Sequence, residues 1–384
     1  MVRIVRYFFL IVAVVLPSAS VTNAQSPARL DDIVLPPGFS IEVYSDDVPN
    51  ARSMALGDAG TVFVATKSQG KVFALVPQDS GSPKVIEIAK DLRTPNGVAF
   101  HDGSLFVAEI SRIVRYDDIE NRLDRIPDPV VVMDTLPDES HHGWRYIAFG
   151  PDGKLYISIG APCNICNREG FANISRMNAD GTGLEVFAQG IRNSVGFTWH
   201  SQTGDLWFTD NGRDMLGDDS PPDELNRAAR SGMHFGYPYC HGGEVKDPEF
   251  GDERDCAEFT APAQKLGPHV AALGVKFYTG DMFPEEYRGR IFIAEHGSWN
   301  RSQKSGYRVS MVKIENGKPL GVEPFAYGWL QDNQVSGRPV DILILGDGSM
   351  LISDDKESRI YRISYSRPLS EGMGDGADDD IQEP

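Results

Sequence analysis

The sequence of 384 residues predicts an all-β chain that folds as a six-bladed β-propeller. Three observations support this fold. A hairpin unit recurs along the chain, with a short apolar strand, a turn rich in Asp and Gly, and a second strand of aromatic and β-branched residues. The intervals between the copies are long enough for a four-stranded blade. Long amphipathic helical patterns are almost absent.

Six copies of the hairpin unit follow one another, and most have the Asp-Gly turn chemistry of tight hairpins. They span residues 53–64, 97–107, 146–157, 195–208, 274–293 and 340–352. Equivalent positions in the second strands are Phe63, Phe106, Tyr156, Trp207, Phe292 and Leu351, which lie 43, 50, 51, 85 and 59 residues apart. The widest interval therefore holds an insertion. The segment 355–365 is predicted to form a further strand of the last blade. The alternative fold is a β-sandwich with a second domain.

The two ends of the chain differ from the repeats. Arg3 and Arg6 precede an apolar run at 7–16, and small residues before Gln25 suit a cleavage site, so residues 1–24 are predicted to be a secretory signal peptide. An uncleaved anchor is the alternative, but the run is short for a bilayer. The propeller is expected over residues 25–366, and residues 367–384 are expected to form an acidic, disordered tail. We therefore expect a periplasmic or secreted protein without stable membrane insertion.

Charge and cysteine usage narrow the function classes. The chain has 37 basic and 55 acidic residues, a net charge of −18, which argues against a nucleic-acid partner. The four cysteines are Cys163, Cys166, Cys240 and Cys256. In an exported protein they predict two disulfides, and of the three possible pairings we favour the two local ones. Cys163 and Cys166 form a Cys-x-x-Cys motif. It is not followed by the His of a haem attachment site, it lacks the helix of a thioredoxin motif, and no second such pair completes a zinc site.

Polar and cationic residues gather at one topological position. In an antiparallel hairpin, the start of the first strand and the end of the second lie at the same end, so six radial hairpins bring these segments to one mouth of the channel. The residues at the strand starts are Arg52, Asn96, His142, Arg145, Arg192, Asn193 and Arg338, and the segments 210–214 and 295–299 follow second strands. A concave mouth is the expected ligand site.

The residue types at this mouth indicate an anionic ligand and a proton acceptor. Several arginines favour an anion bound by paired hydrogen bonds. His142 is the candidate general base, although a packing role is the alternative. The loop 210–224 is rich in carboxylates and carbonyls, hard oxygen ligands that suit Ca²⁺, and its alternative is a solvated acidic loop.

Four segments in a fixed order carry a resemblance to a known family. They begin at His141 (His-His-Gly-Trp-Arg-Tyr-Ile-Ala-Phe-Gly-Pro-Asp-Gly), Gly190 (Gly-Ile-Arg-Asn), Asp223 (Asp-Glu-Leu-Asn, with Phe-Gly-Tyr-Pro from Phe235) and Glu295 (Glu-His-Gly-Ser-Trp-Asn). The chain resembles the soluble glucose/sorbosone dehydrogenase family, most closely its L-sorbosone dehydrogenase-like branch, over residues 30–365. This resemblance implies a propeller that uses pyrroloquinoline quinone (PQQ) and calcium.

The resemblance also implies roles for individual residues. The catalytic histidine falls on His142, with His141 the less favoured neighbour, and the cofactor-clamping pair falls on Arg192 and Asn193. The carbonyls that hold the active-site calcium fall at Gly212 and Arg213. A second, channel-lining calcium site of some members falls on Glu224 and the carbonyl of Phe235, or of His234 because the interval is one residue longer here.

Some family positions differ in this chain. His296 and Gly297 stand where relatives have a lysine that contacts the quinone. Val340 stands two positions after Arg338, where relatives have a second arginine. Asn96 is the nearest polar substitute for a glutamine of the second blade. These residues are the expected cofactor contacts on that side of the mouth.

The resemblance implies an oxidoreductase that acts on an aldose or sugar aldehyde. His142 would take a hydroxyl proton while hydride passes to PQQ, and the electrons would pass on to a cytochrome or quinone acceptor. A calcium-dependent lactonase-type propeller is the first alternative, since Pro95 to Phe100 resembles that class, but the stretch 50–56 lacks its first-blade glutamate. A propeller that only binds another protein is the second.

Overall fold

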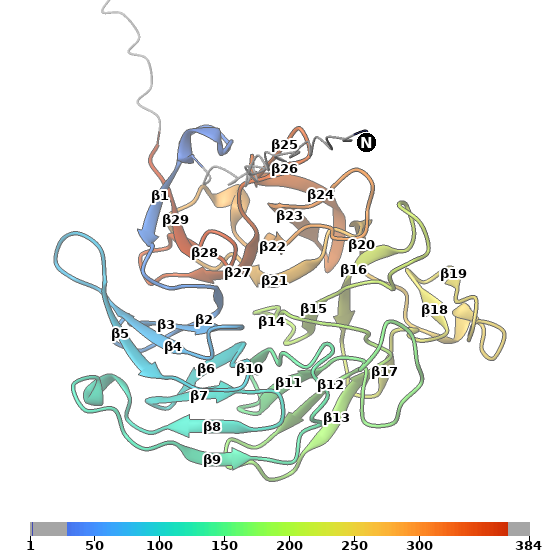
Figure 1. The fold of residues 1–384 in the computed structure, drawn as a ribbon, viewed down its shortest axis with the longest axis horizontal. Helices are drawn as coiled ribbons and strands as arrows, with labels where there is room; N and C mark the ends of the chain where they lie inside the picture. The colour runs from blue at the N-terminus through green and yellow to red at the C-terminus, as the bar shows by residue number, and fades with distance from the viewer. Residues whose placement is uncertain (1, 3–28, 368–384) are drawn as a thin grey trace, which may run out of the picture.

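The computed structural model describes residue 2 and residues 29–367, and it consists of strands joined by turns and short 3₁₀ helices. Six sheets stand side by side around a central axis, so the predicted six-bladed β-propeller is confirmed (Figure 1). The six predicted hairpins are the first two strands of the six sheets. Within the described residues no helix is long and apolar enough to cross a membrane.

The blades follow one another along the chain. The first is β2 (Ala51–Leu56), β3 (Val62–Thr66), β4 (Val72–Val76) and β5 (Lys84–Ala89). The second is β6 (Gly97–His101), β7 (Ser104–Ala108), β8 (Ile113–Tyr116) and β9 (Val130–Met133). The third is β10 (Ile147–Phe149), β11 (Leu155–Ile159), β12 (Asn173–Met177) and β13 (Glu185–Gln189), with β17 (Met233–His234) added in parallel at its edge.

The remaining blades include the insertion and the closure. The fourth is β14 (Phe197–Trp199), β15 (Leu206–Asp210), β16 (Pro222–Ala228) and β20 (Gln264–Pro268). The fifth is β21 (Ala272–Phe277), β22 (Ile291–Glu295), β23 (Arg308–Glu315) and β24 (Lys318–Tyr327). The sixth is β27 (Pro339–Ile344), β28 (Met350–Asp354), β29 (Arg359–Tyr365) and β1 (Phe39–Ser45).

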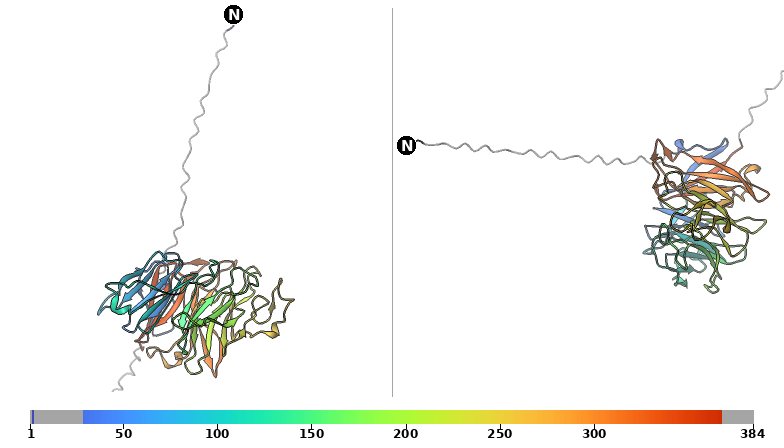
Figure 2. Two further views of the ribbon diagram at one scale, coloured as in Figure 1. Left: turned by 90° about the horizontal axis from the view of Figure 1, so that it is seen from below. Right: turned by 90° about the vertical axis from the view of Figure 1, so that its right-hand side faces the viewer.

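Short elements complete the described chain. Two small hairpins are formed by β18 (Cys240–His241) with β19 (Val245–Lys246), and by β25 (Leu330–Gln331) with β26 (Gln334–Val335). The 3₁₀ helices are η1 (Leu30–Asp32), η2 (Glu120–Arg122), η3 (Cys256–Glu258) and η4 (Glu285–Tyr287). The β18–β19 hairpin belongs to the predicted insertion, and Figure 2 shows this part standing out from the rim of the disc.

The core lies between neighbouring blades. In β3 every residue is buried, because successive side chains of a strand point to opposite faces and both faces are covered. Phe63 packs with Val98 and Leu105 of the second blade, whereas Val64 packs with Leu343 and neighbours of the sixth. Apolar residues on both faces of the inner strands therefore hold each blade between two others.

The ring closes through a strand from the N-terminal side. β1 pairs antiparallel with β29, from Phe39 opposite Tyr365 to Ser45 opposite Ile360. Figure 1 shows this blue strand beside the red end of the chain. The sixth blade thus joins both ends of the described chain, which leaves no open seam in the ring.

Both predicted local disulfides are present. Cys163 is bonded to Cys166 and Cys240 to Cys256, and no described cysteine is free. The first closes a loop that follows β11, and the second closes the insertion between β16 and β20. The predicted signal peptide at 1–24, apart from residue 2, and the acidic tail at 367–384, apart from residue 367, lie outside the described residues.

The strand register brings the predicted segments to one mouth of the channel. Ala51 at the start of β2 lies opposite Thr66 at the end of β3, and Ala272 lies opposite Glu295 in the same way. Arg52 and Lys67 consequently reach the same end of the first blade. The other blades repeat this arrangement.

Candidate active site

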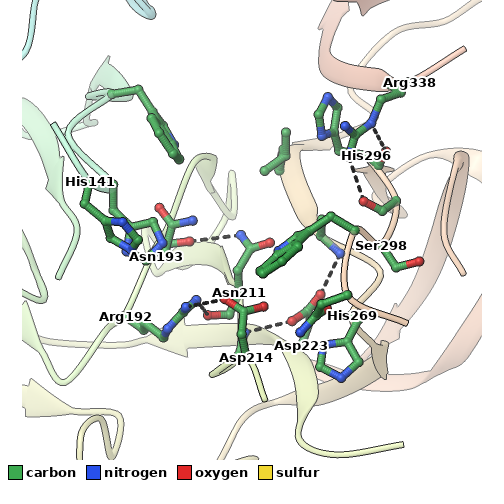
Figure 3. A pocket seen from close by; sticks show the side chains of 18 of the residues that line it. His141, Arg192, Asn193, Asn211, Asp214, Asp223, His269, His296, Ser298 and Arg338 are labelled. Atoms are coloured by element: carbon green, nitrogen blue, oxygen red, sulfur yellow. Dashed lines mark hydrogen bonds and ion pairs between the residues drawn. The ribbon is translucent and has the colours of Figure 1, made fainter. Parts of the chain in front are cut away.

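A cavity of about 320 Å³ opens at the mouth where the first strands of the blades begin. Its walls come from loops between the blades and from the ends of second strands. Most sequence-predicted residues line it, namely His142, Arg192, Asn193, Gly212, His296, Gly297 and Arg338. Figure 3 shows His141 and Arg192 on one side of the cavity and His296 and Arg338 on the other. Asn96, Arg213, Glu224 and Phe235 do not line it.

His142 is held as a neutral imidazole with one nitrogen available. Its Nδ1 lies 2.8 Å from the carbonyl oxygen of Ala161, so Nδ1 carries the proton and donates it, and Nε2 keeps its lone pair. Burial, and then the nearby Arg192 guanidinium, lower the pKa of His142 to about 2. A Cβ on Gly160 would lie 2.6 Å from that of His142, so the close packing requires glycine there.

Arg192 is fixed by a dense set of hydrogen bonds on the same wall. Its Nε donates to Asn164 O (2.9 Å), its Nη1 to Asn211 O (3.1 Å), and its Nη2 to Asn164 Oδ1 (2.9 Å) and Asp214 Oδ2 (2.8 Å). Its backbone N–H donates to the buried Asp210 carboxylate (2.9 Å). One Nη1 hydrogen then remains for a ligand, in a fixed direction.

Arg338 and Arg52 form the opposite wall. Arg338 donates from Nε to His296 O (2.9 Å) and from Nη2 to Gly297 O (2.8 Å), so Nη1 is left for a ligand. Arg52 pairs through Nη1 with Asp355 (2.9 Å) and through Nε with Asn96 Oδ1 (2.9 Å). Asn96 therefore lies behind Arg52 and orients it rather than facing the cavity.

Lys67 is a cavity residue that the sequence reasoning missed. It follows β3 directly, and its Nζ lies 3.7 Å from the centroid of the Trp144 ring. Its backbone N–H donates to Asn50 Oδ1 (3.2 Å), whereas its ammonium has no hydrogen-bond or ion-pair partner among the described residues. Burial, and then the positive Arg52, lower the pKa of Lys67 to about 8. Lys67 directly follows the second strand of its blade, and this position was the sequence signal that could have identified it.

Asn211, Gly212 and Asp214 of the 211–214 loop line the cavity. No described residue donates a hydrogen bond to the carbonyl oxygen of Gly212 or Arg213. The Arg213 side chain turns away to Asp247 and Glu249. Within residues 29–367 no three His, Cys, Asp or Glu side chains converge as a metal site, so a cation here would depend on carbonyl oxygens.

Glu224 and Phe235 are buried outside the cavity. Glu224 faces Asp210 across β15 and β16, and it accepts from Gly242 N (2.7 Å) and Asn226 Nδ2 (2.9 Å). Burial raises the pKa of Glu224 to about 7, and burial together with Glu224 raises that of Asp210. The carbonyl of His234, the alternative ligand, already accepts from Thr260 N (2.8 Å), which favours Phe235.

Two family models match the chain. The glucose/sorbosone dehydrogenase model matches residues 108–298, and a TrAA12-like model matches residues 244–366. The first range contains His142, Arg192 and the 211–214 loop.

Two curated relatives are similar to this chain. A protein of Borreliella burgdorferi described as uncharacterized is 32% identical over 377 residues, 94% of this chain and 98% of its own. A PQQ-dependent pyranose dehydrogenase of Coprinopsis cinerea is 31% identical over 127 residues, 28% of this chain and 17% of its own length. The chain thus spans about a sixth of that relative.

The same fold is present in two solved structures. The calcium structure of a Trichoderma reesei family AA12 enzyme has a TM-score of 0.77 at 19% identity, over 87% of this chain and 97% of that one. The holo form of the C. cinerea pyranose dehydrogenase PQQ domain has a TM-score of 0.75 at 17% identity, over 86% and 97%. The family-model match, the ordered motifs and this fold together place the chain in the glucose/sorbosone dehydrogenase family.

Proposed function

We propose that this protein is an exported PQQ- and calcium-dependent oxidoreductase that oxidises an aldose or a sugar aldehyde of the sorbosone type. The observation that carries the proposal is one cavity that combines four cationic side chains with a neutral histidine whose Nε2 is free. The cations are Arg52, Lys67, Arg192 and Arg338.

The cation set fits a ligand with several carboxylates. Arg192 and Arg338 each keep donors that protein groups do not use, and Lys67 has no acidic partner among the described residues. The carboxylates of PQQ would be bound by these side chains, and a planar guanidinium suits carboxylate geometry. PQQ, when bound, would supply the two-electron hydride acceptor that the side chains lack.

His142 would hold the substrate proton. Its Nε2 would accept the hydroxyl proton, while Ala161 O stabilises the protonated ring through Nδ1. Arg192 is the largest charge that lowers the pKa of His142, so an anion bound at Arg192 would raise that pKa towards its ordinary value. Ligand binding would therefore make His142 a stronger base.

Calcium would be held by the carbonyl oxygens of Gly212 and Arg213, and its charge would polarise the bound quinone. We assign a second cation to Glu224 and the Phe235 carbonyl. Glu224 lies opposite Asp210, so two buried carboxylates face one another at this position. The calcium structure of the T. reesei enzyme with the same fold supports the choice of metal.

The partners follow from the chemistry of the reaction. The substrate is a small sugar, and the electrons would pass to a cytochrome or quinone acceptor. The two disulfides support a periplasmic or secreted location, where such bonds persist.

Reconstitution tests the proposed function. Purified protein with PQQ and Ca²⁺ is expected to reduce a dye in the presence of an aldose or sugar aldehyde. Hydrolysis of a lactone without any dye reduction would favour the lactonase alternative. Absence of both activities and of PQQ binding would leave the protein-binding alternative.

Replacing Lys67 with Gln is expected to weaken PQQ binding about tenfold at neutral pH, because a charged hydrogen bond is lost. The affinity of the unmodified protein should also fall as the pH rises through about 8, since Lys67 loses its charge there. A fluorescence titration with PQQ at several pH values measures both effects. Lys71→Gln is the control, since Lys71 pairs with Glu87 at a partly exposed position outside the cavity. If the PQQ affinity of Lys67→Gln depended on pH in the same way as that of the unmodified protein, Lys67 would not belong to the PQQ site.

Removal of calcium by a chelator is expected to lower the Tm by roughly 5 °C relative to protein at about a hundred times the Kd. Differential scanning calorimetry measures the shift. Mg²⁺ should not restore it, because Mg²⁺ sheds its water reluctantly and demands a strict octahedron. A Tm that does not respond to Ca²⁺ would contradict the assigned sites.

A further inference from the structure

Asn164 lies inside the short loop that the Cys163–Cys166 disulfide closes, next to the wall of the cavity. Its carbonyl oxygen accepts from Arg192 Nε (2.9 Å), and its Oδ1 accepts from Arg192 Nη2 (2.9 Å). Two of the donors that fix the guanidinium therefore depend on one residue that does not itself line the cavity.

The same side chain also fixes the 211–214 loop. Asn164 Oδ1 accepts from the backbone N–H of Asp214 (2.9 Å), and its Nδ2 donates to the carbonyl of Asp214 (3.1 Å). Asp214 in turn pairs with Arg192 Nη2 (2.8 Å). The amide thus uses both its acceptor and its donor, and it joins Arg192 to the loop that carries Gly212 and Arg213.

The disulfide loop is anchored at its far end. The backbone N–H of Cys166 donates to the hydroxyl of Tyr237 (3.0 Å), and Cys163 Sγ lies 3.5 Å from the same oxygen. Tyr237 is buried within the insertion. Asn164 is consequently presented from a loop that is closed covalently and held at a fixed point.

We propose that Asn164, held by the Cys163–Cys166 loop, is a positioning residue that sets Arg192 and the 211–214 loop in the geometry that binds the cofactor. Its effect on PQQ rests on the proposed function, whereas its contacts with Arg192 do not. The disulfide then serves the site, because it fixes the residue between its two cysteines.

Asn164→Ala is the central test, with Asn167→Ala as the matched control from the adjoining segment. Asn167 is exposed, and its amide donates to the Tyr239 hydroxyl (2.9 Å), away from Arg192. In the protein without cofactor, solvent exchange of the Arg192 Nη2 hydrogens, measured by NMR, is expected to speed up at least about tenfold in Asn164→Ala, because Nη2 loses its Asn164 Oδ1 acceptor. Asn167→Ala should leave it unchanged.

PQQ affinity is the second readout. It should fall by about ten- to a hundredfold in Asn164→Ala and stay near the parent value in Asn167→Ala. Asn164→Asp should also bind weakly, because it replaces the donor to the Asp214 carbonyl with an oxygen. Joint replacement of Cys163 and Cys166 by Ser should speed the Arg192 exchange in the same direction.

The two readouts separate the failures. If the parent protein binds no PQQ, the proposed function fails, and the Arg192 exchange still decides the role of Asn164. If Asn164→Ala matches Asn167→Ala in the exchange measurement, the positioning role is overturned. If the exchange changes but PQQ affinity does not, Asn164 orders Arg192 without any consequence for the cofactor, which also overturns the proposal.

Discussion

Replacing His142 with Ala is expected to lower kcat by roughly two to four orders of magnitude while PQQ affinity changes little. The reason is the division of labour in the site. His142 contributes a lone pair at Nε2 and lies on the Ala161 side of the cavity, whereas the cations that would bind the quinone come from other loops. Dye reduction at saturating sugar measures kcat, and a PQQ titration measures affinity.

The backbone at His142 calls for a second variant. Its φ of 50° lies in the left-handed region, which Asn adopts more readily than Ala. His142→Asn keeps that conformation without the imidazole base, so it should lose turnover equally. His141→Ala is the matched neighbour, since its ring also lines the cavity and packs against His142. Near-normal turnover in both His142 variants, or a larger loss in His141→Ala, would remove His142 from the role of base.

The propeller could be predicted because its inner hairpins repeat a local pattern. The side chains of β3 are buried on both faces, so their apolar character appears directly in the sequence. The outer strands could not be located in this way. β9 is half exposed on both faces, and β1 reaches the sixth blade only through pairing with β29, more than 300 residues away. Such pairing depends on closure of the ring and leaves no local signal.

The mouth residues could be predicted from strand position alone, and their side-chain directions could not. Arg192 and Arg338 precede first strands and line the cavity as expected. Asn96 occupies an equivalent position, but its amide turns to Arg52. Asn164 lies five residues beyond β11 and 28 before Arg192, and it meets Arg192 only in the folded structure. Its role depends on tertiary contact.

Replacing Arg192 with Ala is expected to weaken PQQ binding by about 10²- to 10³-fold, because truncating one partner of a buried, hydrogen-bonded charge pair costs about 2–5 kcal/mol. Arg192 is 3% exposed, and its guanidinium links Asn164, Asn211 and Asp214. The variant would lose the remaining donor for the ligand and would also leave the Asp214 carboxylate without its cation. A PQQ titration by fluorescence or calorimetry measures the loss.

Unfolding of an Arg192 variant and loss of its contact with PQQ would give different results. Arg176→Ala is the matched control. Arg176 pairs with Glu185 and Asp152 within the third blade, but it does not line the cavity. Arg192→Lys keeps the charge, yet one ammonium cannot reproduce the fixed fork of donors, so its PQQ affinity should stay well below that of the parent. Unchanged PQQ affinity in Arg192→Ala, with the fold intact by circular dichroism, would contradict the clamp. Full affinity in Arg192→Lys would reduce the role of Arg192 to its charge, because only the charge survives that substitution.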